Sequence, residues 1–222
     1  MTVVATRRSG SAARLPIRDL IGCLLSDDVE GAISLAQRVL EETNSRTAVF
    51  ADLLHPAQAE IGDLWYSGRI SVADEVRVAA TVRMIVGRLA PTPVARPVAR
   101  GSRCILAVPR HDPHDLGLMM LMLAMQDHGW STDVLAPVVG LDDLVEVVVS
   151  RRPRLFGLSA VRLPPLQQIE RTISAIKRAG IPVLVGGVGF NRRPDLWRRL
   201  GADGLGTDVR VGVVLAQRLC GR

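Results

Sequence analysis

Aromatic residues make up only 3% of the 222 residues, and no apolar run reaches the length of a membrane span. Charged side chains interrupt every apolar stretch before the roughly 18 residues that a transmembrane helix requires, so we expect no membrane partner. The first residues lack the apolar core of a secretory signal, which predicts a cytoplasmic protein. The three cysteines, Cys23, Cys104 and Cys220, are too widely spaced for a disulfide framework or a zinc site and are expected to be reduced.

The net charge of +6 raises the question of nucleic-acid binding. The arginines are scattered, few aromatic rings are available for stacking, and no helix-turn-helix or zinc-finger pattern is found. We therefore expect no direct DNA binding, although an anionic ligand or partner is compatible with this charge. The sequence also offers no catalytic nucleophile or acid–base pair, because Asp74 and Glu75 are adjacent on a predicted helix and point in different directions. We do not predict an enzyme.

Residues 14–90 form the first predicted domain, a four-helix bundle that follows a flexible tail at residues 1–13. Apolar residues recur at helical spacing in four stretches, over residues 15–25, 27–43, 46–66 and 71–89. We expect Ser26 or Asp27 to cap the second helix and Pro56 to kink the third.

Two of these helices carry apolar stripes that we predict to face the bundle interior. In the third helix the stripe consists of Ala57, Ile61, Leu64 and Trp65. In the fourth helix it consists of Val72, Val76, Ala79 and Ala80.

Residues 91–102, rich in proline and arginine, read as a linker to a second domain at 103–222. In this domain five short apolar runs alternate with helical stretches, which predicts an α/β fold with a doubly wound, five-stranded parallel sheet. The runs cover residues 104–109, 133–135, 155–159, 182–185 and 204–205, and the helices begin near residues 115, 141, 165, 194 and 209. Such a sheet binds its ligand at the carboxyl ends of its strands.

Polar and glycine-rich motifs follow three of these predicted strands. The first strand is followed by Asp112-Pro113-His114-Asp115-Leu116-Gly117, the third by Ser159-Ala160-Val161 and the fourth by Gly186-Gly187. Asp112 lies two residues before His114, so its carboxylate can bond one ring nitrogen and orient the other toward a metal. Glycines at a strand end let a bulky ligand approach the backbone closely. A lone histidine in a loop is usually only hydrated, but three motifs in order indicate a ligand site.

These motifs, on a flavodoxin-like fold behind a helical bundle, resemble the cobalamin-binding domains of methionine synthase, corrinoid methyl carriers and cobalamin-dependent light-sensing repressors. The resemblance covers residues 103–220, and the bundle resembles the helical cap of these proteins. It implies that His114 is the axial ligand of cobalt and that Asp112 orients it. It further implies that four residues line the pocket for the cobalamin tail, Gly117, Ser159, Gly186 and Gly187, and that Asp115 and Val161 also belong to the cofactor-binding residues.

The segment from Trp65 to Glu75 resembles a tryptophan-x9-glutamate motif of the light-sensing repressors. The resemblance implies that Trp65 and Glu75 lie over the upper face of the corrin, although a tryptophan here can also be a plain core residue of a two-helix corner. In the repressors a histidine follows the glutamate, whereas this sequence has Val76. We therefore expect no second histidine ligand from this position and an open space above the ring.

Three functional hypotheses follow. The first is a photoreceptor or sensor that holds adenosylcobalamin, loses the adenosyl group in light, and acts as a dimer or tetramer on a signalling partner that the sequence does not identify. A bilin such as biliverdin is a possible second chromophore by resemblance to photocobilins, with Arg77, Arg83 and Arg88 on its propionates. The second hypothesis is a corrinoid methyl carrier for a methyltransferase, and the third is an interaction module without cofactor.

Overall fold

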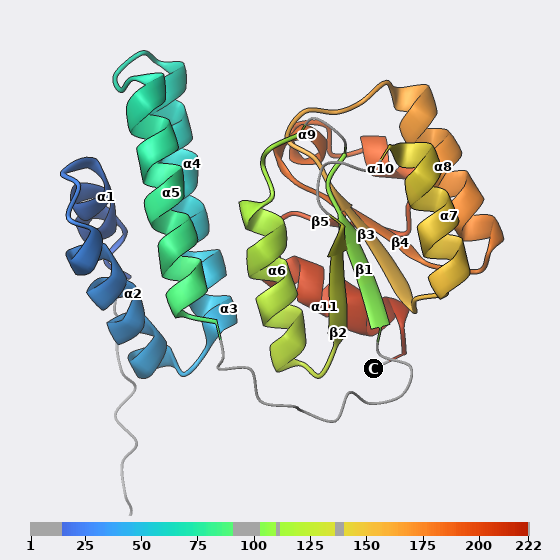
Figure 1. The fold of residues 1–222 in the computed structure, drawn as a ribbon, viewed down its shortest axis with the longest axis horizontal. Helices are drawn as coiled ribbons and strands as arrows, with labels where there is room; N and C mark the ends of the chain where they lie inside the picture. The colour runs from blue at the N-terminus through green and yellow to red at the C-terminus, as the bar shows by residue number, and fades with distance from the viewer. Residues whose placement is uncertain (1–14, 91–102, 110–111, 136–139, 222) are drawn as a thin grey trace, which may run out of the picture.

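The computed structural model describes residues 15–90, 103–109, 112–135 and 140–221. The predicted tail at 1–13 and the predicted linker at 91–102 lie outside these residues. The helical part comprises α1 (Ile17–Leu25), α2 (Val29–Thr43), α3 (Arg46–Ala48), the π-helix η1 (Val49–Leu54), α4 (His55–Tyr66) and α5 (Val72–Arg88). These elements confirm the helical stretches, and Figure 1 shows them packed beside the sheet domain.

The start of α2 differs from the prediction. Asp28 is its N-cap and accepts a hydrogen bond of 2.9 Å from the backbone N–H of Gly31. Neither Ser26 nor Asp27 caps the helix, because Ser26 ends α1 and donates to Gly22 O, while Asp27 adopts a φ of 63° that reverses the chain. A left-handed residue between two helices thus moves the cap one position along the chain.

The third helical stretch contains a π-helix directly before Pro56, the residue at which a kink was predicted. Pro56 lies in the first turn of α4, where its missing N–H has no partner to lose within that helix. Just before it, the N–H of His55 donates to Phe50 O, five residues back, which closes the wide turn of η1. The chain therefore passes through α3, η1 and α4 without a break in helical structure.

Helix α5 begins beside Ser71, where the fourth stretch was predicted to start and which is its N-cap, but its buried face is not the predicted one. Its core-facing residues are Val78, Thr81, Val82, Ile85 and Val86. The predicted stripe is open, with Val72 62% and Val76 59% exposed. The helix thus carries two apolar stripes. The stripe from Val78 to Val86 has the larger side chains, and it is this stripe that packs into the bundle interior. Trp65 of α4, also predicted to face inward, is 45% exposed.

The sheet domain has the predicted doubly wound α/β architecture. Its strands are β1 (Arg103–Ala107), β2 (Ser131–Leu135), β3 (Leu155–Ser159), β4 (Val183–Gly186) and β5 (Gly204–Gly206), all parallel in the order β2-β1-β3-β4-β5. This order is that of a flavodoxin-like sheet. The helices are α6 (Leu116–Asp127), α7 (Leu141–Arg151), α8 (Leu166–Arg178), α9 (Val188–Asn191), α10 (Leu196–Arg199) and α11 (Val209–Leu219). Among them, the short helix α9 was not predicted.

The helical part packs against one side of the sheet domain. Helices α6 and α11 cover the face nearer to it, and α7 and α8 cover the other face (Figure 1). Apolar residues of the bundle, α6 and α11 form one continuous core, while α7, α8 and the opposite sheet face form a second. Ion pairs reinforce the contact, between Arg46 of α3 and Asp127 of α6 and between Arg210 of α11 and Asp52 of η1. No helix in the described part of the chain is long and apolar enough to cross a bilayer.

Candidate metal and ligand site

The three predicted motifs meet at the carboxyl edge of the sheet. Strands β1, β3 and β4 are neighbours, so the loops that follow them lie side by side. The register pairs Ser159 at the end of β3 with Gly186 at the end of β4. The loop after β1 carries Asp112 and His114 and leads into α6. The parallel topology thus assembles one site from residues that are far apart in the sequence.

Asp112 links the histidine to the neighbouring loop. Its carboxylate is 1% exposed and has four hydrogen-bond donors around it. One oxygen lies 2.6 Å from Nδ1 of His114 and 3.2 Å from the backbone nitrogen of the same residue. The other oxygen accepts from the backbone N–H groups of Val161, at 2.7 Å, and Arg162, at 3.1 Å. Asp112 therefore fixes the histidine to the loop after β3.

This network holds Asp112 ionised and sets the tautomer of His114. Burial alone would raise the pKa of Asp112, but the hydrogen bonds from the ring of His114 and from three backbone N–H groups outweigh it and hold the pKa below its ordinary value. A backbone N–H can only donate, so the carboxylate acts as acceptor toward each of them. Nδ1 of His114 then carries the proton, and its Nε2 presents a lone pair on a half-exposed side chain. This arrangement suits a metal ion that reaches Nε2 of His114 from the solvent side of the sheet edge.

Gly186 and Gly187, at the end of β4, allow close contacts with β5 and with the loop after β3. A Cβ on Gly187, whose φ is 88°, would lie 2.6 Å from Ala160 O, and a Cβ on Gly186 would lie 2.9 Å from Gly206 O. These glycines let the β4 loop lie against β5 and the β3 loop, which gives them a packing role, and their contact with a ligand stays a prediction. Ser159 is half-buried, and its hydroxyl makes no hydrogen bond to any residue of the described part. It stays available to a ligand.

Replacing Gly187 by alanine is expected to lower the free energy of unfolding by more than about 2 kcal/mol, because the new Cβ meets both backbone strain and backbone atoms. Gly180→Ala is the matched control, since Gly180 has a φ of 77° and nothing within 4 Å of an added Cβ. It should cost about 1 kcal/mol from strain alone. Urea denaturation of both variants measures the difference, and equal losses would contradict the packing role.

Gly117, in the first turn of α6, behaves differently from the glycine pair. It is exposed, and a Cβ there would meet no atom within 4 Å. The structure thus leaves free space beside the first turn of α6, next to His114. This space agrees with the prediction that a bulky ligand passes close to Gly117.

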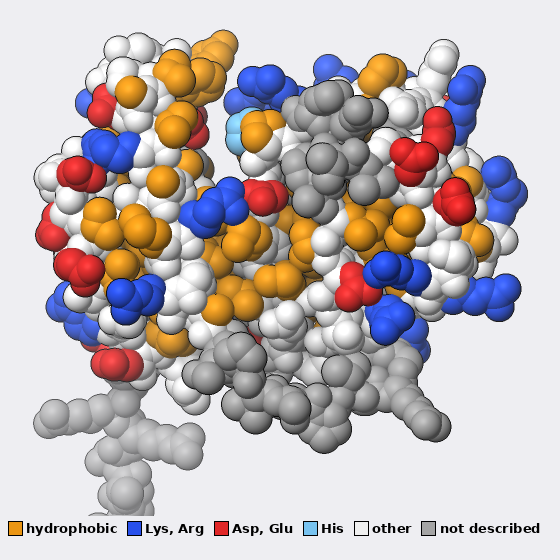
Figure 2. All heavy atoms as spheres, in the orientation of Figure 1, with side chains coloured by type: hydrophobic (Ala, Val, Ile, Leu, Met, Phe, Trp, Pro, Cys, Tyr) orange, Lys and Arg blue, Asp and Glu red, His pale blue; other side chains and the backbone are white. Residues whose placement is uncertain are grey.

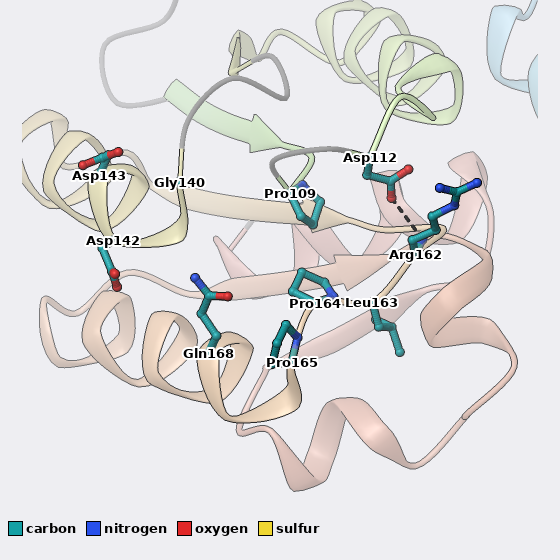
Figure 3. A pocket seen from close by; sticks show the side chains of 10 residues that line it. All are labelled: Pro109, Asp112, Gly140, Asp142, Asp143, Arg162, Leu163, Pro164, Pro165 and Gln168. Atoms are coloured by element: carbon teal, nitrogen blue, oxygen red, sulfur yellow. Dashed lines mark hydrogen bonds between the residues drawn. The ribbon is translucent and has the colours of Figure 1, made fainter.

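A cavity of about 660 Å³ lies behind Asp112, on the side of α7 and α8. Its walls come from the ends of β1 and β3 and from the first turns of α7 and α8 (Figure 3). Its polar side chains combine donors and acceptors: Arg162, Gln168, Asp142 and Asp143. Arg162, whose backbone N–H donates to Asp112, was not predicted, because a backbone contact leaves no signal in the residue type.

Helix α5 faces the histidine loop from the other side. Arg83 of α5 pairs with Asp115 at 2.6 Å, directly after His114. Val72 and Val76 share the helix face of Arg83, because they precede it by eleven and seven residues, and Val76 lies about 10 Å along the axis from it. Figure 2 shows a hollow between the helical part and the sheet domain. The exposed valines therefore overlook the space next to His114.

The predicted positions of Trp65 and Glu75 over a ligand stay predictions. Trp65 ends α4 and is exposed, while Glu75 lies half-buried in the first turn of α5 with no ion pair to a described residue. Asp74 instead completes a capping box with Ser71. A histidine nitrogen beside the exposed valines of α5 suits a ligand that brings most of its own metal donors.

Two of the three arginines predicted to meet a bilin are already engaged. Arg77 donates to the backbone carbonyls of Leu24 and Leu25 and pairs with Asp27 at 3.0 Å, so it closes the end of α1. Arg83 pairs with Asp115. These contacts give Arg77 and Arg83 structural roles that were not predicted.

Comparison with protein families identifies the domain. A family model described as a B12 binding domain matches residues 102–214, and a second model with the same description matches residues 17–90. The chain belongs to the B12-binding domain family. The two matches correspond to the sheet domain and to the helical part, which confirms the predicted resemblance.

Curated relatives in this family include regulators. The chain is 30% identical over 154 residues to the HTH-type transcriptional repressor CarH of Myxococcus xanthus, a match that covers 68% of this chain and 50% of that protein. It is 28% identical over 190 residues to the repressor CarA of the same organism, covering 82% of this chain and 60% of the relative. The chain thus spans between half and two thirds of the length of these relatives.

Solved structures show the same fold. The monomethylamine corrinoid protein of Methanosarcina barkeri superposes with a TM-score of 0.70 at 16% identity, covering 90% of this chain and 96% of that one. The arrangement of a helical part before a flavodoxin-like domain is therefore shared with another B12-domain fold.

Proposed function

We propose that this chain is a cytoplasmic sensor module that binds adenosylcobalamin through His114 and responds to light by a change in the packing of its helical part. The single observation that carries the proposal is the hydrogen bond from His114 Nδ1 to buried Asp112, which leaves Nε2 free for cobalt. The similarity to CarH and CarA favours a regulatory role over a catalytic one.

In this proposal different residues contact the lower and the upper face of the cobalamin. His114 would hold cobalt from below, with its orientation fixed by Asp112. Ser159 and the cavity behind Asp112 offer polar groups to the amide edges and nucleotide tail of a corrinoid. Trp65, Val72 and Val76 would cover the upper ligand with an apolar surface. Adenosylcobalamin supplies a weak cobalt–carbon bond that green or blue light cleaves.

Loss of the upper group would change what α5 packs against. Val72 and Val76 are open in this structure, so their contacts depend on what lies above the histidine. Val76 has no side-chain atom that could ligate cobalt, so this position would supply no second protein ligand. We propose that the helical part then repacks and alters a dimer or tetramer, which a signalling partner senses.

An absorption titration tests the function. Purified protein mixed with adenosylcobalamin should show a bound spectrum that changes under green light, together with a shift in elution on gel filtration. Unchanged ligand spectra would contradict cobalamin binding. Binding without a photochemical response would favour the corrinoid methyl carrier, and absorbance in the red after adding biliverdin would extend the proposal to a bilin.

A further inference from the structure

Asp115 lies immediately before α6 but does not cap it. The side chain makes no capping hydrogen bond, and its φ of −95° and ψ of −7° differ from the extended conformation of an ordinary N-cap. Its carboxylate reaches across to Arg83 of α5, at 2.6 Å from Nη2 and 3.4 Å from Nη1. In the described part of the chain, the N–H groups of Gly117 and Leu118 donate to no other residue. Asp115 thus serves the contact between domains instead of its own helix.

The ion pair between Arg83 and Asp115 lies between a packed part and an open part of the contact between the helical part and the sheet domain. Toward the far end of α6, Arg46 holds Asp127, and apolar residues of the bundle, α6 and α11 form a continuous core. On the other side of Arg83, the same face of α5 presents the exposed residues Val72 and Val76. Arg83 and Asp115 are themselves partly exposed, and such ion pairs are weak. The ion pair between Arg83 and Asp115 can therefore break while the apolar core shared by the bundle, α6 and α11 stays packed.

We propose that Asp115 is a two-position latch: it pairs with Arg83 when the helical part is closed over His114, and it caps α6 through the N–H groups of Gly117 or Leu118 when the helical part moves away. In this role Arg83 is a positioning residue. Capping requires the ψ angle of Asp115 to turn toward the extended region, and Asp115 follows His114 directly in the chain. The position of α5 and the orientation of the metal ligand are thereby coupled. The inference rests on the proposed function for its signal, but the latch itself is a property of the protein alone.

Amide hydrogen exchange on the full chain without cofactor tests the latch. Arg83→Met frees Asp115 to cap α6, so exchange at Leu118 or Gly117 should slow about five-fold. A merely structural contact would leave exchange there unchanged or make it faster, and either result in a folded Arg83→Met variant would overturn the proposal. Arg83→Gln removes the same charge with a polar side chain and should give the same slowing if Arg83→Met is unstable.

Matched variants sharpen the result. Arg88→Met removes an exposed arginine from the same helix and should leave exchange at Gly117 and Leu118 as in the parent. Adding Asp115→Ala to Arg83→Met removes the cap and should restore fast exchange. In a separate measurement, bound cobalamin followed by absorption should leave Arg83→Met about ten-fold faster than the parent. A parent chain that binds no cobalamin would refute the proposed function and leave the exchange result standing.

Discussion

Replacing His114 by alanine is expected to reduce cobalamin affinity more than about 100-fold, with the remaining bound fraction lacking the spectrum of histidine-ligated cobalt. Among the described residues at this edge, only the His114 imidazole has one ring nitrogen bonded to a buried carboxylate and the other left for a metal. Even residues that only support a metal ligand cost ten- to a hundred-fold in affinity when removed, so loss of the ligand itself should exceed that range. Absorption titration with aquocobalamin and adenosylcobalamin measures the effect.

The fold should survive this substitution, because the His114 side chain is half-exposed and Asp112 keeps three of its four donors. His128→Ala is the control: that ring bonds Ala124 O in the last turn of α6, at the opposite end of the helix, and its loss should not change cobalamin affinity. His114→Gly with added imidazole should regain part of the parent spectrum. Parent affinity and spectrum in a folded His114→Ala protein would show that cobalt is not bound through this residue.

The sheet domain was predictable because each strand is an apolar run followed by a turn or cap signal. Buried parallel strands leave short apolar runs in the sequence, and β3 covers the predicted residues 155–159. The topology places the motif after the first strand at the carboxyl edge, and the spacing of Asp112 and His114 predicted the hydrogen bond that the structure shows between them. Their roles toward cobalt stay predictions that the proposed variants test.

The helical part was harder to predict, because its details depend on tertiary contacts. Helix α5 has two apolar stripes, and only the packing of its neighbours decides that Val82 is buried and Val76 is open. The π-helix before Pro56 presents Asp52 to Arg210 of α11, a partner 158 residues away. The backbone donors to Asp112 from Val161 and Arg162 have no signal in residue type. Contacts made by the backbone or across domains were therefore the ones missed.

Asp112→Asn is expected to lower the free energy of unfolding by about 3 kcal/mol and cobalamin affinity by ten- to a hundred-fold. An asparagine keeps the shape, but its NH2 group faces either the two donors of His114 or the N–H groups of Val161 and Arg162. Whichever way it turns, buried donors lose their acceptor. Urea denaturation of the protein without cofactor and absorption titration measure the two effects separately.

The effect of Asp112 should also depend on pH in a defined direction. Because the hydrogen bonds overcome burial and lower the pKa of Asp112, its contribution to stability is complete above the ordinary carboxyl pKa and is lost as the pH falls through the lowered value. The stability gap between parent and Asp112→Asn should be constant near neutral pH and shrink below about pH 4. Asp133→Asn, which removes a partly exposed partner of Arg151, should change stability by less than about 0.5 kcal/mol. A gap that stays constant well into acid would mean that the ionised carboxylate is not what holds the β1 and β3 loops together.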